Sequence, residues 1–254
     1  EFPTPLDDYK SQVDEPDFYS DERVRIICGF SGAGKTSWAA QTAMHSCEFN
    51  VYFDVGDMPS SSVCATLVRE VSAKLVTQNI DELKSILYPG ASGIDSMMLL
   101  DNYLKKQNKH SVIVIDNSHR LLFDSLKDLL NATSFIKFIL LCQPKQVVDE
   151  IEVNFGLQRE SLRGWSIDTI AGQSSTYSCS GTIHDYDNLK NATGALPLYV
   201  RSAFKVINSE YSGNISEFCL ALSEQMNIET TAQELILTQS ITILPKEVLD
   251  ILAV

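Results

Sequence analysis

Residues 24–36 read Val-Arg-Ile-Ile-Cys-Gly-Phe-Ser-Gly-Ala-Gly-Lys-Thr. The first five form an apolar run typical of a buried strand, and an Ala-rich segment from about Lys35 to His45 predicts a helix. Between them lies the pattern Gly-x-x-x-x-Gly-Lys-Thr, whose glycines let the backbone turn successive N–H groups toward an anion. The helix that follows adds the positive end of its dipole. The stretch therefore predicts a loop that binds the phosphates of a nucleotide.

The loop gives particular side chains expected roles. Lys35 reaches the β- and γ-phosphates, and the hydroxyl of Thr36 holds Mg²⁺. A chance match to the pattern occurs in roughly one chain in a hundred of this size, and the flanking strand and helix make chance rarer still. The residues expected to contact the nucleotide here are Gly29, Ser31, Gly32, Ala33, Gly34, Lys35, Thr36 and Ser37.

Asp116 ends a second apolar run, residues 111–115. Continuous apolar strands of this kind suit a parallel sheet that is covered on both faces. An acid at the end of such a strand can hold Mg²⁺, so Thr36 and Asp116 are the expected metal ligands. The alternative is an ordinary Asp that caps the next helix. Asn117 stands where many P-loop ATPases have a second acid, and since an amide cannot accept a proton, we expect slow hydrolysis.

Two more positions follow strand ends. If strand 135–141 lies between the loop strand and the Asp116 strand, Gln143 lies near the γ-phosphate, where it orients water or reports hydrolysis; otherwise it is a plain loop residue. His119 and Arg120 either sense the nucleotide or face solvent. The expected catalytic set is Lys35, Asp116, Asn117 and Gln143.

Strands and helices alternate from Val24 to Ile170, and residues 165–170 are the predicted fifth strand. This alternation predicts an α/β fold, a doubly wound parallel sheet of five strands, and the helical periodicity of residues 184–230 predicts a small helical domain after it. The expected divisions are an acidic arm at 1–22, the nucleotide-binding domain at 23–172, the helical domain at 173–232, and the start of a winged-helix-like domain at 233–254.

Residues 192–199 read Ala-Thr-Gly-Ala-Leu-Pro-Leu-Tyr. This stretch resembles the Gly-x-Pro motif of the STAND class of signal-transduction P-loop NTPases, the NB-ARC and NACHT-like proteins. The motifs also occur in the family's order, with the phosphate loop first, then the strand ending in Asp116, the strand before Gln143, and the helical region. The resemblance covers about residues 24–208, and more weakly the rest of the chain.

The resemblance implies a regulatory ATPase that binds ATP or ADP with Mg²⁺ and acts as a conformational and oligomerisation switch. It places Pro197 near the adenine; the alternative is a simple helix start, which proline favours. Asp116-Asn117, Cys142-Gln143 and the lack of a Gly-Arg element before the loop depart from the family pattern. These departures concern the rate of hydrolysis and the recognition of the base, and none of them concerns phosphate binding.

Composition bears on partners and compartment. The formal net charge is −13 with no run of Lys or Arg, so nucleic acid is a less favoured partner than protein, including self-association in the full-length protein. We see neither a secretory signal nor an apolar run long enough to cross a membrane, and expect an intracellular protein, cytoplasmic or nuclear, with no membrane partner. The sequence ends inside an apolar helix, so we expect the natural chain to continue.

Three other functions remain open at this stage. An AAA+-type ATPase, such as a DNA-associated loader or motor, shares the motifs through Asp116, although the acidic charge counts against a DNA-facing module. A kinase would use the same loop but needs an acceptor pocket. A nucleotide-binding scaffold without hydrolysis is compatible with Asn117.

Overall fold

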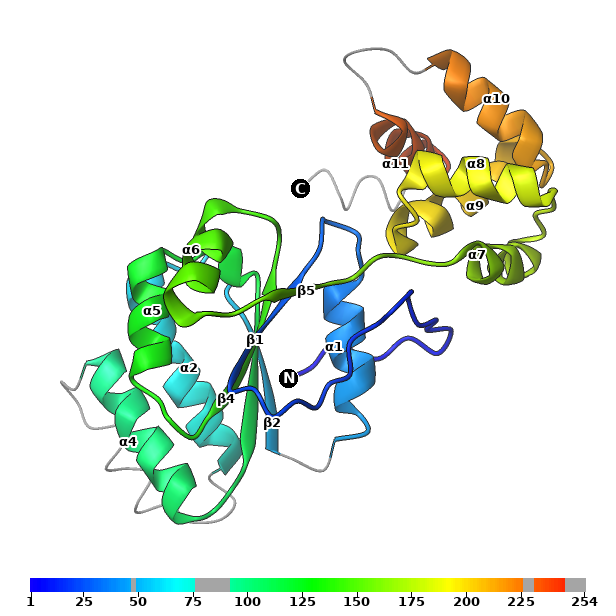
Figure 1. Cartoon of the computed structure of the whole chain (residues 1–254). Helices are drawn as coiled ribbons and strands as arrows, with labels where there is room; N and C mark the ends of the chain where they lie inside the picture. The colour runs from blue at the N-terminus through cyan, green and yellow to red at the C-terminus, as the bar shows by residue number, and fades with distance from the viewer. Residues whose placement is uncertain (47–48, 76–91, 226–230, 245–254) are drawn as a thin grey trace. The chain divides into compact units, whose positions relative to one another are not determined.

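The computed structural model describes residues 1–46, 49–75, 92–225 and 231–244 (Figure 1). The chain divides into two compact units. The first comprises residues 1–9, 16–30 and 35–161, and the second comprises 10–15, 31–34 and 162–254. Each unit has a hydrophobic core of its own.

The first unit is built on a five-stranded parallel sheet in the order β2-β3-β4-β1-β5. The strands are β1 (Val24–Cys28), β2 (Phe49–Asp54), β3 (Ser111–Asp116), β4 (Lys137–Cys142) and β5 (Arg159–Ser161). In register, Val24 pairs with Phe138 and Cys28 with Cys142 on one side of β4, and Val112 pairs with Lys137 on the other. The central strands are buried along their length because helices cover both faces of the sheet.

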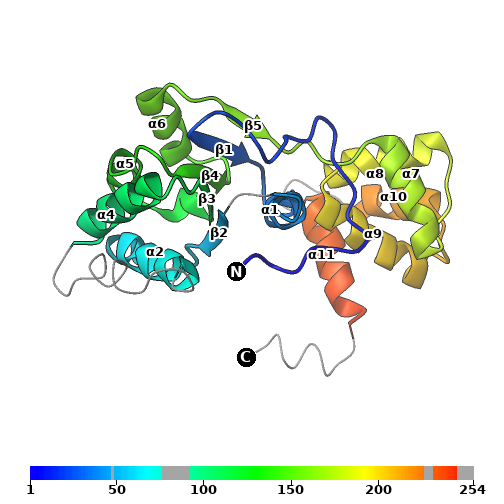
Figure 2. The same cartoon turned by 90° about the horizontal axis from the view of Figure 1, so that it is seen from below.

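Helices cover the two faces unequally, as Figures 1 and 2 show. The helices of this unit are α1 (Lys35–Ala43), α2 (Ser60–Leu75), α4 (Gly93–Lys106), α5 (Phe123–Asn131) and α6 (Gln146–Phe155), with a 3₁₀ turn at Ser118–Arg120. The last four pack on one face around Ile26, Ile115 and Leu140. Helix α1 lies on the other face. The predicted five-stranded parallel α/β sheet is confirmed, and β4 lies between β1 and β3, the position that the expectation for Gln143 requires.

The prediction of a strand at residues 165–170 is wrong. The hydroxyl of Ser166 accepts the N–H of Thr169 and caps helix α7 (Ile167–Ser174). The fifth strand is instead β5, three residues on the open side of β1. Its side chains Arg159, Glu160 and Ser161 carry no apolar pattern, because an edge strand need not be buried.

The described residues of the second unit after 162 are mainly helical. Its helices are α7, α8 (Ile183–Thr193), α9 (Pro197–Glu210), α10 (Ile215–Gln225) and α11 (Ala232–Thr242), with a 3₁₀ turn at Ser175–Tyr177. Their buried side chains, Phe204 and Phe218 among them, form one core. Helix α11 contributes Ile236 to this same core. The winged-helix-like start expected at 233–254 stays a prediction, and its residues 245–254 lie outside the described part of the chain.

Candidate nucleotide-binding site

Lys35 is held against its own loop in the first unit. Its Nζ donates to the carbonyl oxygens of Gly29 at 2.7 Å and of Phe30 at 3.1 Å. Burial lowers the pKa of Lys35, and the nearby carboxylate of Asp116 acts in the opposite direction. The ammonium group therefore lies at the end of β1, against the first residues of the phosphate loop.

The side chains of Thr36 and Asp116 meet directly. The Thr36 hydroxyl donates to Oδ2 of Asp116 at 2.5 Å, and the Tyr52 hydroxyl donates to the same oxygen at 2.7 Å. Asp116 is only 4% exposed, so its carboxylate depends on these donors in place of water. Burial and the contact with Asp116 raise the pKa of Tyr52 and keep its phenol protonated. The sequence does not distinguish Tyr52 from the other apolar and aromatic residues of its strand.

Asn117 has a structural role that the sequence did not reveal. Its backbone is left-handed, with φ of 57°, and its N–H donates to Oδ1 of Asp116 at 2.7 Å. Its side-chain amide donates to Oδ1 of Asp54 at 2.8 Å. Asp54 ends β2, in register with Asp116 at the end of β3. The position after Asp116 thus holds an amide that faces a carboxylate from the neighbouring strand.

Gln143 directly follows β4, which lies between β1 and β3. Its backbone N–H donates to Nδ1 of His119 at 3.2 Å. His119 is buried, and burial together with the positive charges of Lys35, Lys145 and Arg120 lowers its pKa. Arg120 is exposed and pairs with Asp57 at 2.7 Å. The two residues therefore differ: His119 ties the ends of β3 and β4 together, and Arg120 faces solvent.

The middle of the loop belongs to the second unit, where it contacts the segment 194–199. The N–H of Leu198 donates to the carbonyl of Gly32 at 3.3 Å. A Cβ built on Gly32 would lie 3.0 Å from Cβ of Leu198, and the φ of Gly32 is +81°. Pro197 opens helix α9, and its Cγ lies 3.8 Å from a Cβ built on Gly34. The Gly-x-Pro segment therefore lies against the phosphate loop.

Gln12 reaches the same loop from the N-terminal segment. Its Nε2 donates to the carbonyl of Ala33 at 2.6 Å, and its Oε1 accepts the N–H of Gly164 at 2.8 Å. The side chain is buried. No sequence motif marks this residue, which was expected to belong to an acidic arm. Of the other loop residues, Ser31 is exposed and Ser37 lies in the first turn of α1.

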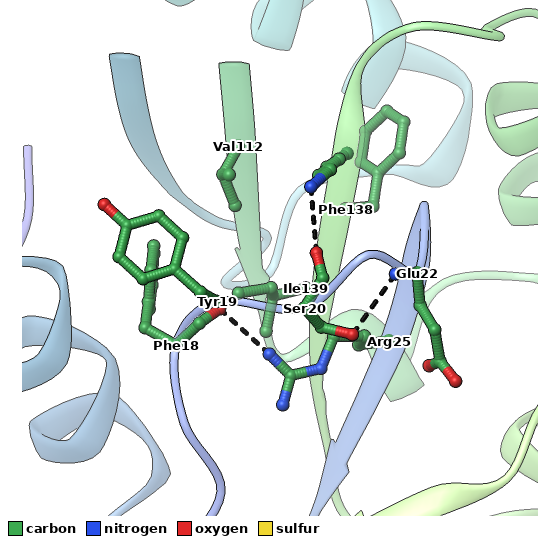
Figure 3. Close-up of a pocket in the computed structure, with 9 residues that line it drawn as sticks. Phe18, Tyr19, Ser20, Glu22, Arg25, Val112, Phe138 and Ile139 are labelled. Carbon is green, nitrogen blue, oxygen red and sulfur yellow. Dashed lines mark hydrogen bonds between the residues drawn. The ribbon is translucent and has the colours of Figure 1, made fainter. Parts of the chain in front are cut away.

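The segment that precedes β1 is held by polar contacts near the start of that strand (Figure 3). Arg25 donates to the carbonyl of Phe18 at 2.9 Å, and Lys137 donates to that of Ser20 at 2.8 Å. Arg25 also forms an ion pair with Glu160 at 2.7 Å. All of these residues except Glu160 line a small pocket at the start of β1. The phosphate loop follows the other end of this strand, so the pocket is separate from the loop.

The hydroxyl of Thr36 and the carboxylate of Asp116 suit Mg²⁺, but two protein ligands do not enclose a metal ion by themselves. A hydroxyl and a carboxylate are the hard oxygen ligands that Mg²⁺ takes, usually with waters and substrate phosphates. Among the described residues there is no cluster of three or more His, Cys, Asp or Glu that could hold a metal.

The helices that the structure describes include none that is long and apolar enough to span a membrane.

Comparisons with known proteins agree with this fold. A family model described as an AAA domain matches residues 19–149, more than half of the 254 residues. A Walker-type ATPase of Pyrococcus abyssi shares the fold at 10% identity and a TM-score of 0.54, over 80% of this chain and 68% of that one. A STAND protein of Pyrococcus horikoshii with a tetratricopeptide repeat sensor is 21% identical and has a TM-score of 0.50. The match covers 71% of this chain and 27% of that one.

A third structure, the ORC2 protein of Aeropyrum pernix in ADPNP-ADP complexes, gives 16% identity and a TM-score of 0.49, over 84% of this chain and 64% of that one. The chain thus spans between 27% and 68% of the lengths of these three proteins. Curated protein sequences gave no match. At these identities the structural likeness shows the fold alone.

Proposed function

Because this chain belongs to the AAA domain family, we propose that it binds ATP and ADP with Mg²⁺ and acts as a slow, nucleotide-dependent switch. The chain carries an AAA-type P-loop ATPase domain, and the proposal concerns what that domain does. The observation that carries it is the direct contact of Thr36 with Asp116 beside Lys35, at the ends of β1 and β3. Two neighbouring side chains of the loop thus meet a carboxylate from 80 residues further along the chain.

In this proposal each residue of the site has its own role in binding the nucleotide and Mg²⁺. Lys35 would exchange its two carbonyl partners for phosphate oxygens, which are stronger partners for an ammonium group. Thr36 and Asp116 would hold Mg²⁺, which supplies neutralisation of phosphate charge when it is bound. Tyr52 would keep Asp116 oriented, because its hydroxyl already donates to that carboxylate.

Slow hydrolysis is supported by the groups around Asn117. A fast ATPase needs a group that accepts a proton from water or orients it closely. Asn117 accepts no proton, and its amide is occupied by Asp54. Gln143 follows β4 at the same edge of the sheet and remains the proposed residue for orienting water.

The switch is supported by the contact of segment 194–199 with loop residue Gly32. A nucleotide shifts a conformational equilibrium only by as much as it binds the two states with different affinity. Phosphates that alter the loop alter its fit to Leu198 and Pro197, so the nucleotide state can be passed to helix α9. In this STAND-like proposal the exchange of ADP for ATP exposes surfaces for protein partners and self-association. The alternative is an AAA+-type loader or motor.

The test is the identity of the nucleotide that co-purifies with the protein. We expect ADP in the wild-type protein, released after denaturation and identified by anion exchange. Lys35→Ala should remove it and lower affinity for added ADP by more than about 100-fold, because a charge-assisted contact with phosphate is lost. Lys106→Ala, an exposed lysine at the end of α4, is the matched control. An empty site with rapid, unaided ATP turnover would replace the switch with the motor alternative.

A further inference from the structure

One buried side chain of the second unit joins three separate segments of the chain. Gln12 donates from Nε2 to Ala33 and accepts at Oε1 from Gly164. Its backbone neighbours are paired with the same partner segment. The N–H of Val13 donates to the carbonyl of Gly164 at 3.0 Å, and Nε1 of Trp165 donates to that of Lys10 at 3.2 Å. Residues 10–13 and 164–165 therefore form one hydrogen-bonded strap.

The bond to Ala33 fixes the direction of a peptide in the phosphate loop. A trans peptide is planar, so the carbonyl of Ala33 and the N–H of Gly34 point in opposite directions. With the carbonyl held by Gln12, the N–H of Gly34 is directed away from the strap. The φ of Gly34 is +84°, a conformation that glycine adopts without strain.

The peptide before it is fixed in the same way. The N–H of Leu198 holds the carbonyl of Gly32, so the N–H of Ala33 is directed away from helix α9. Gly32 and Gly34 both have positive φ, and Ala33 between them does not. Alternation of this kind is the backbone pattern that gathers successive N–H groups into an anion-binding nest.

We infer that Gln12 is a positioning residue for the phosphate loop: it couples the affinity of the loop for phosphate to the pairing of segments 10–13 and 164–165. The inference rests on the proposed nucleotide site and adds a residue that controls it. The coupling is reciprocal, so an anion bound in the loop stabilises the pairing of the strap by the same free energy by which this pairing strengthens anion binding. Gln12 suits the task because one amide carries both a donor and an acceptor.

Gln12→Glu separates the two contacts. The substitution keeps the shape and an acceptor for Gly164, but it replaces the donor to Ala33 with a carboxylate oxygen. We expect the affinity for ADP to fall about tenfold or more, since a buried carbonyl loses its partner and meets a negative charge. Binding of adenosine, which has no phosphate, should change less than about twofold. Asp14→Asn, which removes the charge of an exposed ion pair with Arg163 next to the strap, is the matched control.

Isothermal titration of ADP and adenosine into the wild type and both variants measures the affinity of each protein for each ligand. Equal losses for the two ligands would mean that Gln12 merely stabilises the fold, and unchanged ADP affinity would remove its role altogether; either result overturns the inference. A wild type that binds no nucleotide would instead remove the proposed function.

A second measurement uses the unaltered protein, in case the variant folds poorly. Hydrogen exchange is followed in residues 10–13 and 164–165 with and without pyrophosphate. We expect slower exchange in both segments when pyrophosphate is present, because the anion favours the arrangement in which the strap is paired. Exchange that pyrophosphate leaves unchanged overturns the inference even if the variant cannot be studied.

Discussion

At the residue scale, the pair formed by Asn117 and Asp54 bears most directly on turnover. The side-chain amide of Asn117 donates to a carboxylate that ends the adjacent strand. A single Asn117→Asp change would set two carboxylates against each other. The double exchange Asp54→Asn with Asn117→Asp preserves the hydrogen bond and moves the acid to the position after Asp116. We expect ATP hydrolysis to rise about tenfold or more in the exchanged protein, because a general base typically contributes 10²–10⁴-fold.

Phosphate release at saturating ATP and Mg²⁺ measures this effect. Asp54→Asn alone is the control, since it weakens the pair without adding an acid after Asp116. Equal rates in the exchanged protein and the wild type would show that the residue at 117 does not limit hydrolysis.

His119 gives a prediction of pH dependence. Its neutral Nδ1 accepts the N–H of Gln143, and its folded pKa lies below the ordinary value of 6.5 because of burial and the cations Lys35, Lys145 and Arg120, with Asp116 opposing them. The unfolded chain therefore binds a proton at a pH where the folded chain does not. The free energy of unfolding should fall as the pH drops below 6.5, and be fully restored above it.

Urea unfolding at a series of pH values between neutral and mildly acidic compares the wild type with His119→Asn. The variant keeps an acceptor near the N–H of Gln143 but does not titrate. We expect its unfolding free energy to depend less steeply on pH than that of the wild type. Matching slopes would assign the dependence to other groups.

The local part of the site could be predicted from the sequence, and the rest could not. Lys35 and Thr36 are fixed by spacing within one loop, and Asp116 by its place at the end of an apolar strand. Gln12, Tyr52 and Asp54 act through partners that are 21, 64 and 63 residues away in the chain. Spacing within the sequence carries no information on such pairs, because only the fold brings them together.

At the element scale, the same limit explains the wrong fifth strand. Residues 165–168 alternate in polarity like a strand, but Ser166 and Thr169 have the spacing of a helix N-cap, and the cap forms. The three central strands, β1, β3 and β4, were predictable because a strand covered on both faces needs a continuous apolar run. Strand β5 has only three residues and pairs only with β1, so pairing, and not its side chains, defines it.

Asp101 of helix α4 shows how one helix positions β4. Its carboxylate is 3% exposed and accepts backbone N–H groups of Ser134, Phe135 and Ile136 at 2.9, 2.9 and 2.8 Å. Asp101→Ala leaves these donors unpaired just before the strand begins. We expect a loss of about 3 kcal/mol or more in unfolding free energy, measured by urea denaturation. The exposed neighbour, Asn102→Ala, should cost less than about 0.5 kcal/mol. Similar losses in both variants would contradict the role of Asp101.

At the scale of the whole molecule, two separate cores imply two centres of stability. Phe138 belongs to the core under the sheet, and Phe204 to the core among the helices of the second unit. Both side chains are buried, so truncating either to Ala should cost about 3–5 kcal/mol. Because the two side chains belong to different clusters, we expect each substitution to lower the hydrogen-exchange protection mainly of the amides in its own unit.

Hydrogen exchange resolves where the loss falls. In Phe204→Ala, the amides of α8 and α9 should exchange faster while those of β3 and β4 keep their protection; Phe138→Ala should reverse the pattern. Faster exchange throughout the chain in both variants would mean that the units unfold together. Separate opening would show that the second unit can change its conformation while the sheet stays folded. The proposed switch uses such independence, because a nucleotide biases an equilibrium between conformations that it binds with different affinity.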